Sequence, residues 1–347
     1  MSVDIGIGLF TGQVPPDSPR SFTQEYREMV DLVRLAETLG FDSAWVSEHH
    51  GSGDGYMPSL LPTLAAFAVA TDRIKLGTGV SLTPFYHPLR LAEDAATVDL
   101  ISGGRLILGL GLAWRHEEFR MFDVPLTERV RRTVETIDVL RLAWGGERFS
   151  YQGRMFRFEQ VKVSPAPERP NGRGVPIFLG GSVSPAIRRA GRLADGYIRT
   201  RAGGVDAMRS DLRTAEEGAR ATGRDPSSLV FAQLQNAFVW DRGDAWQVCG
   251  GAVANQLGIY GGWAAGGDTP EQGFVLAPPD EATMRALTPA GTPHDVVRAL
   301  RPQVEAFTGR GEFHLIVRLH YPGMEFDTAA HAIELFGERV IPALKGA

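Results

Sequence analysis

Cysteine is almost absent from this chain, since Cys249 is the only one among 347 residues. No disulfide can form within the chain, and such usage is typical of proteins in a reducing cytoplasm. Metal shells built from cysteine are excluded for the same reason, and no helical His-x-x-x-His spacing is present to replace them. We therefore predict no bound metal.

Long apolar runs and clustered positive charge are also missing. No apolar stretch approaches the roughly 18 residues that a membrane helix needs, and residues 1–4 do not resemble the start of a signal peptide. The 36 basic residues are scattered among 41 acidic ones, which leaves a net charge of -5. This balance argues against nucleic acid or an anionic membrane as a partner. These absences predict a cytoplasmic protein that acts on a small molecule.

What the chain does contain is a regular alternation of short β-rich apolar segments and longer segments with a helical period. The predicted strands span residues 3–10, 44–46, 73–82, 105–110, 175–179, 196–200, 229–239 and 313–319. The predicted helices span residues 22–39, 60–70, 89–101, 128–144, 185–194, 205–221, 293–307 and 328–344. Repeated strand–helix units imply parallel strands, and about eight of them predict an α/β fold, a single-domain (β/α)₈ TIM barrel over residues 1–347.

Residues 240–279 do not follow this alternation. They are rich in glycine and aromatic residues, including Trp246, Tyr260 and Trp263, and show no clear period. We interpret them as an insertion after the seventh strand that forms part of the barrel mouth or a lid, because active sites of such barrels lie at the carboxyl ends of the strands. An excursion that is mobile or contacts a second subunit fits the composition equally well.

The second predicted strand ends in Ser47-Glu48-His49-His50, followed by a loop rich in glycine. Titratable side chains at the carboxyl end of a barrel strand stand where catalytic groups belong. A histidine there can exchange a proton near neutral pH, as general acid–base catalysis requires. The alternative is a histidine that only holds the loop by hydrogen bonds.

Glycines occur within or directly after the third and fourth predicted strands, at Gly77, Gly79, Gly109 and Gly111. Glycine weakens a strand, so its presence there predicts the close approach of a backbone or a flat ligand. The alternative is a tight passage from strand to helix. The fourth-strand glycines do not match a dinucleotide motif, because the third glycine is absent.

A glycine- and serine-rich turn, Gly180-Gly181-Ser182-Val183-Ser184, joins the fifth strand to a helix that starts with proline. Backbone N–H groups and the helix dipole at such a place favour a phosphate group. The alternative is a helix capped by the Ser184 side chain. We favour the phosphate site because of its position at the active end of the barrel.

These segments together resemble the bacterial luciferase-like family of flavin- and deazaflavin-dependent oxidoreductases. The resemblance extends from Val3 to about Thr200, and the order and spacing of its motifs are more specific than any one of them. The motifs are AWVSEHH (44–50), RIKLGTG (73–79), HPLRLAED (87–94), ISGGR (101–105), PIFLGGS (176–182) and RLADG (192–196).

The resemblance implies a TIM barrel that binds reduced FMN, or a deazaflavin relative, at the carboxyl ends of its strands. It implies a catalytic role for His49 and a non-proline cis peptide at Gly79–Val80. The implied cofactor contacts, phosphate site included, are Glu48, Thr78, Gly79, Val80, Gly111, Trp114, Gly180, Gly181, Ser182 and Ser184. Luciferase proper has a phosphate-binding arginine where this chain has Leu112, so we do not predict light emission; Arg115 is the nearest substitute.

The function that these features predict is a monooxygenase that uses oxygen and reduced FMN, supplied by an external flavin reductase. Tyr56, Met57 and Trp114 suggest a small, largely apolar substrate, although a core role for each is open. The alternative is hydride transfer with a deazaflavin coenzyme; Glu48-His49-His50 favours FMN, since deazaflavin members more often have Asp-His there. A non-catalytic flavin-binding subunit is the alternative of another class. The resemblance also implies a homodimer.

Overall fold

The computed structural model describes residues 3–170, 172, 174–200, 203–263, 280–307 and 309–346. A single parallel sheet closes on itself because β3 pairs with both β2 and β5, in the order β3-β2-β1-β13-β10-β9-β8-β5-β4. The barrel strands are β1 (Val3–Phe10), β2 (Ser43–Val46), β3 (Lys75–Thr78), β4 (Ser81–Leu82), β5 (Leu106–Gly111), β8 (Ile177–Gly180), β9 (Gly196–Arg199), β10 (Val230–Asn236) and β13 (Phe313–Arg318). Since β3 and β4 share one position, the predicted eight-position barrel is confirmed.

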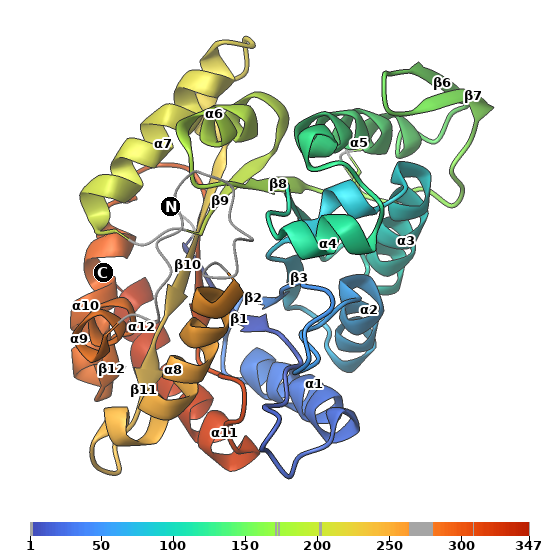
Figure 1. The fold of residues 1–347 in the computed structure, drawn as a ribbon. Coiled ribbons are helices and arrows are strands. Elements are labelled where there is room, and N and C mark those ends of the chain that lie inside the picture. The colour runs from blue at the N-terminus through green and yellow to red at the C-terminus, as the bar shows by residue number, and fades with distance from the viewer. Residues whose placement is uncertain are drawn as a thin grey trace.

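Helices surround the strands on the outside (Figure 1). The covering helices are α1 (Phe22–Thr38), α2 (Leu60–Ala70), α3 (Pro88–Ile101), α5 (Arg129–Ala143), α6 (Ser184–Leu193), α7 (Val205–Arg220), α10 (Pro293–Glu305), α11 (Phe326–Leu335) and α12 (Ile341–Lys345). The remaining elements are α4 (His116–Met121), α8 (Ala245–Trp263), α9 (Glu281–Leu287), the hairpin β6 (Phe149–Gln152) and β7 (Arg157–Val161), and the pair β11 (Phe238–Val239) and β12 (Ala290–Gly291). No helix among the described residues is long and apolar enough to span a membrane.

One tryptophan fills much of the barrel interior. Trp45 is fully buried and packs with Ile107, Phe178 and other inward residues. A Cβ at Gly77 would lie 2.2 Å from its ring. The glycine of the third strand therefore makes room for a side chain of the barrel itself, which is one form of the close approach predicted from the sequence.

The largest departure from the sequence prediction is the region after the seventh strand. Residues 245–263 form the helix α8, although we predicted no regular structure there, and residues 264–279 lie outside the described part of the chain. The buried positions of α8 include Ala245, Cys249, Val253 and Gln256, which follow a helical spacing. Five glycines in this helix hide that period in the sequence, because glycine has low helix propensity and no side chain to mark a face.

Two predicted strands are also shorter than expected. The seventh bends at Ala237, where β10 ends and β11 begins, and the third breaks between Thr78 and Ser81. The Gly79–Val80 peptide in that break is cis, as the resemblance implied, and a second non-proline cis peptide joins Gly8 and Leu9. Both breaks lie at the carboxyl end of the barrel, where strand pairing gives way to the site.

Candidate active site

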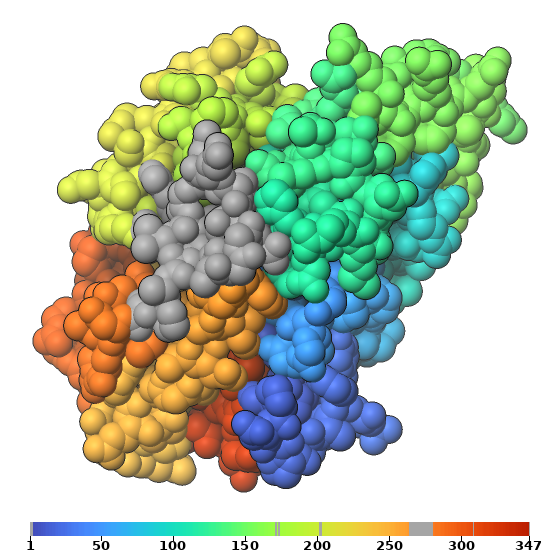
Figure 2. Space-filling view, in the orientation of Figure 1, coloured from blue at the N-terminus to red at the C-terminus, as the bar shows by residue number. Residues whose placement is uncertain are grey.

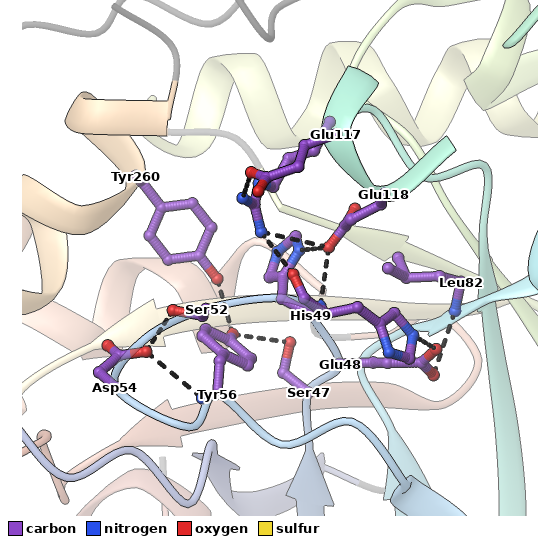
Figure 3. Close-up of polar contacts among 12 residues, drawn as sticks. Ser47, Glu48, His49, Ser52, Asp54, Tyr56, Leu82, Glu117, Glu118 and Tyr260 are labelled. Atoms are coloured by element: carbon purple, nitrogen blue, oxygen red, sulfur yellow. Dashed lines mark hydrogen bonds and ion pairs between the residues drawn. The ribbon is translucent and has the colours of Figure 1, made fainter. Parts of the chain in front are cut away.

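The residues that follow β2 lie at the carboxyl end of the barrel, between α4 and α8 (Figure 3). Their backbone is held by two neighbours: the Ser47 amide donates to Phe10 O over 3.1 Å, and the His49 amide donates to Met57 O over 3.2 Å. His49 is 5% exposed. The sequence prediction that a histidine stands at the active end of the barrel is therefore matched by its position in the structure.

His49 is paired with a carboxylate from another element. Its Nδ1 lies 2.8 Å from Oε1 of Glu118, in the first turn of α4, and Glu118 is fully buried. The same oxygen accepts the backbone N–H of His50 over 3.0 Å. A carboxylate at Nδ1 favours the tautomer with hydrogen on that nitrogen, which leaves the Nε2 lone pair free to accept a proton. The arrangement can act as a general base or acid.

Glu48 holds the loop by hydrogen bonds to both of its carboxylate oxygens. One oxygen lies 2.8 Å from His50 Nε2, and the other accepts from the Tyr86 hydroxyl over 2.7 Å and from the Leu82 amide over 3.3 Å. Burial, with Glu48 beside it, raises the pKa of Tyr86 well above its usual value, so this phenol remains a donor. These contacts give Glu48 a structural role in the loop, and its predicted cofactor contact stays a prediction.

Aromatic rings enclose His49. Ring centres lie 4.8 Å away for Tyr56 and for Trp263, 5.7 Å for Tyr260 and 6.0 Å for Trp114. Tyr260 and Trp263 belong to α8, whose surface adjoins that of the loop after β2 in Figure 2. An apolar enclosure of this kind keeps water from a reacting centre and strengthens the polar contacts inside it. This contact supports the mouth assignment of the predicted insertion as far as Trp263.

Two tyrosine hydroxyls meet beside this enclosure. The Tyr56 and Tyr260 oxygens are 2.7 Å apart, and the Tyr56 hydroxyl also donates to Ser47 Oγ over 3.1 Å. Burial raises the pKa of Tyr56, against the opposing effect of the nearby Arg318 guanidinium, and raises that of Tyr260 well above its usual value. Both phenols therefore remain protonated at neutral pH and can donate hydrogen bonds.

Arg115 is buried and engaged by groups of the protein itself. It is 1% exposed, donates to His50 O over 2.9 Å and pairs with Glu117 at 2.5 Å. Its Cζ lies 4.0 Å from the centre of the Trp263 ring, in a cation–π contact that ties α8 to α4. Arg115 is therefore engaged within the protein, and its use in place of the phosphate-binding arginine of luciferase stays a prediction.

Val80 provides an apolar surface between two strand ends. A Cβ at Gly111 would lie 2.3 Å from Val80 Cγ2, and one at Gly180 would lie 3.2 Å from Val80 Cγ1. These two glycines leave room for Val80, which is partly exposed. A flat ring system fits such a surface. By contrast, Thr78 is fully buried and its hydroxyl donates to Gly109 O over 2.6 Å, in a bond between strands. Its predicted cofactor contact stays a prediction.

The predicted phosphate cradle lies at the start of α6. The N-cap residue is Val183 and no side chain caps the helix, so the alternative of a Ser184 cap is wrong. Gly181 and Ser182 are partly exposed and Ser184 is exposed. A ten-residue helix without a side-chain cap presents N–H groups that an anion can accept as partners. These residues fit a cofactor phosphate.

Comparisons with known proteins bear on the origin of this site. The family of luciferase-like monooxygenases matches residues 4–308. The chain belongs to this family. Within the luciferase-like family, it is 31% identical over 340 residues to an F420-dependent glucose-6-phosphate dehydrogenase of Nakamurella multipartita, covering 92% of each chain.

Two further relatives differ in the activity that their names give. An F420-dependent hydroxymycolic acid dehydrogenase of Mycobacterium tuberculosis is 34% identical over 239 residues, which cover 65% of this chain and 64% of that protein. The crystal structure of monooxygenase RslO1 from Streptomyces bottropensis has a TM-score of 0.83 and 27% identity, covering 98% of this chain and 99% of that one. This luciferase-like chain is therefore an oxidoreductase whose relatives include both dehydrogenases and a monooxygenase.

Proposed function

We propose that this protein is a deazaflavin-dependent dehydrogenase that moves a hydride between coenzyme F420 and a small hydroxyl-bearing substrate. The observation that carries the proposal is the His49–Glu118 pair, in which the His49 ring lies within an enclosure of aromatic rings. Similarity to F420-dependent dehydrogenases supports the deazaflavin as the cofactor. The sequence Glu48-His49-His50 had led us to predict FMN first.

In this proposal the chain's own residues manage one proton. When a substrate hydroxyl lies against His49, Nε2 takes its proton as the alcohol carbon is oxidised. Glu118 holds the imidazole in the required tautomer and stabilises the imidazolium that results. Tyr260 and Trp263 exclude water from the exchange. The deazaflavin, when bound, supplies the two-electron hydride acceptor.

The cofactor has two fitting contacts among the described residues. Val80, beside Gly111 and Gly180, offers an apolar surface to the flat ring system. The start of α6 offers uncapped N–H groups to the phosphate. We assign the ring to the first and the phosphate to the second.

An FMN-dependent monooxygenase is the second candidate. The likeness to RslO1 over nearly the whole chain favours it. It would require reduced FMN from a separate reductase, whereas the dehydrogenase would not. The homodimer implied by the family resemblance remains a prediction for both candidates, to be measured by light scattering.

The test is an anaerobic titration of the intact protein with F420 and with reduced FMN, followed by tryptophan fluorescence. The six tryptophans include Trp114 and Trp263, whose rings lie close to that of His49. Tight binding of F420 together with its reduction by an alcohol would support the proposal. Tight binding of FMN alone, with oxygen uptake, would replace it by the monooxygenase.

A further inference from the structure

One buried arginine at the mouth has no carboxylate partner in the described part of the chain. Arg318 ends β13 and follows Ile316, an inward residue of the barrel, by two positions, so alternation directs its side chain into the mouth. It is 5% exposed, and its NH1 nitrogen is buried without a hydrogen-bond partner among the described residues. No ion pair involving Arg318 occurs among those residues either, and burying an unpaired charge is unfavourable.

Other buried arginines of the chain are paired. Arg20 lies 3.0 Å from Glu25 and also contacts Glu28, and Arg199 lies 2.8 Å from Asp211. Arg20 is the best comparison with Arg318. It is 8% exposed, and the charges of Arg20 and Arg318 both lower the pKa of His320. A guanidinium that lacks such a partner in the same region is available for an anion from outside the chain.

The surroundings of Arg318 are neutral donors. Arg318 lies beside the Tyr56 hydroxyl and acts electrostatically on Tyr260. His320, two residues further, is held neutral, because burial together with Arg318 and Arg20 lowers its pKa to about 4. The nearest carboxylates of this group are already paired: Glu118, which acts electrostatically on Tyr260, lies 2.8 Å from His49, and Glu25, 3.7 Å from His320, is paired with Arg20. An oxyanion at this place would therefore receive a guanidinium and phenolic hydroxyls.

We infer that Arg318, with the hydroxyls of Tyr56 and Tyr260, forms a subsite for a carboxylate or phosphate group of the substrate. The Tyr56 ring contacts His49 while its hydroxyl faces Arg318, so one tyrosine ring separates the anionic group from the proton-accepting nitrogen. The cofactor phosphate is assigned elsewhere, after β8, and β9 and β10 separate β8 from β13. The assignment to the substrate rests on the proposed function, whereas anion binding at Arg318 does not.

Binding of simple anions tests the subsite directly. Inorganic phosphate and acetate are titrated calorimetrically into the intact protein, alone and with saturating F420. We expect saturable binding of at least one anion in both conditions, at least tenfold weakening in Arg318→Met, and an intermediate effect in Arg318→Lys, which keeps the charge and loses the planar fork. Arg120→Met, an exposed charge loss on α4, is the matched control and should bind as the wild type does.

Stability separates a binding role from a structural one. Because no described carboxylate pairs with Arg318, Arg318→Met should raise the Tm of the protein without ligand by about 2–4 °C. Arg20→Met should lower the Tm, because it leaves the buried Glu25 and the partly buried Glu28 without their cation. A Tm loss in Arg318→Met like that of Arg20→Met, or its failure to fold, would show a structural arginine and overturn the inference.

The remaining outcomes are equally decisive. Equal anion affinity in Arg318→Met, no anion binding at all, or loss of binding when F420 is added would overturn the subsite; the last result would place the anion at the cofactor phosphate position. Arg318-dependent anion binding in a protein that does not bind F420 would support the subsite and overturn the proposed dehydrogenase. The two proposals therefore fail separately.

Discussion

The proton chemistry of the mouth depends on a single imidazole. With Nδ1 bonded to Glu118 at 2.8 Å, His49 offers only Nε2 to a substrate. We predict that His49→Ala lowers kcat by at least about 100-fold, the usual contribution of a general base, while the dissociation constant for F420 changes little. Stopped-flow reduction and fluorescence titration measure the two quantities. His294→Ala, an exposed histidine on α10, is the control, and equal turnover in the His49 variant would contradict its role.

Glu118 is a positioning residue for that imidazole. Glu118→Gln keeps the shape and one acceptor oxygen, so we predict a kcat loss of at least about tenfold with an unchanged KM, consistent with the effect of removing an outer-shell partner. Glu118→Ala should lose more, and this graded rescue is not expected of a purely structural residue. Glu117→Gln, which alters the half-exposed neighbour, is the matched control. Parallel rises in KM in all three variants would argue for a packing role instead.

The sequence was informative about His49 and silent about Glu118. A histidine that directly follows a strand is visible as a local pattern. Its partner lies 69 positions away, on a six-residue helix too short to show a period, and only the tertiary fold joins them. Arg318 left no clear signal either, because the inward positions of β13 already include a polar residue, His314, so a cation there does not stand out.

At the scale of helices, α6 and α7 approach each other more closely than side chains allow. A Cβ at Gly191 would lie 1.8 Å from Ala215 O, and one at Gly218 would lie 2.2 Å from Arg188 O. We predict that Gly191→Ala destabilises the protein by about 1–3 kcal/mol, the range for overpacking a tight contact. Differential scanning calorimetry measures the change.

A second glycine provides a control, because its replacement by alanine should not lower the stability of the protein. A Cβ added at Gly251, within α8, would meet no described atom within 4 Å. Gly251→Ala should therefore keep or raise the Tm, since alanine favours a helix by roughly 0.5–1 kcal/mol over glycine. A neutral Gly191→Ala would mean that the two helices can separate without loss.

Elements were predictable where the period was strong and not where tertiary contacts decide. The helix over residues 22–39 was predicted within one residue of α1, because Met29, Leu32, Val33 and Ala36 mark its buried face and Ser21 caps it. The helix α8 was missed, since its glycines obscure the face that packs on the barrel. The breaks at Thr78 and Ala237 follow from pairing with other strands, which the local sequence does not encode.

At the scale of the whole molecule, a polar cluster closes the amino end of the barrel, opposite the mouth. Lys75 Nζ lies 2.8 Å from Glu312 and 3.2 Å from Asp4, and His314 Nε2 lies 2.7 Å from Glu312. These contacts join β1, β3 and the start of β13, so they connect the first and last strands of the chain. This closure serves stability, because barrel chemistry takes place at the other end.

This cluster predicts how the protein responds to acid. The hydrogen bond from His314, assisted by Lys75, lowers the pKa of Glu312 from 4.5 to about 2. A carboxylate whose pKa is depressed in the folded state stabilises it above the unfolded value and loses that contribution as pH falls through the folded one. We therefore expect the difference in Tm between the wild type and Glu312→Gln to be full above about pH 5 and to vanish towards about pH 2. Thermal unfolding at intervals of pH measures it, with exposed Glu305→Gln on α10 as the control. A Tm difference that stays constant across this window would show that Glu312 contributes by packing and not by its charge.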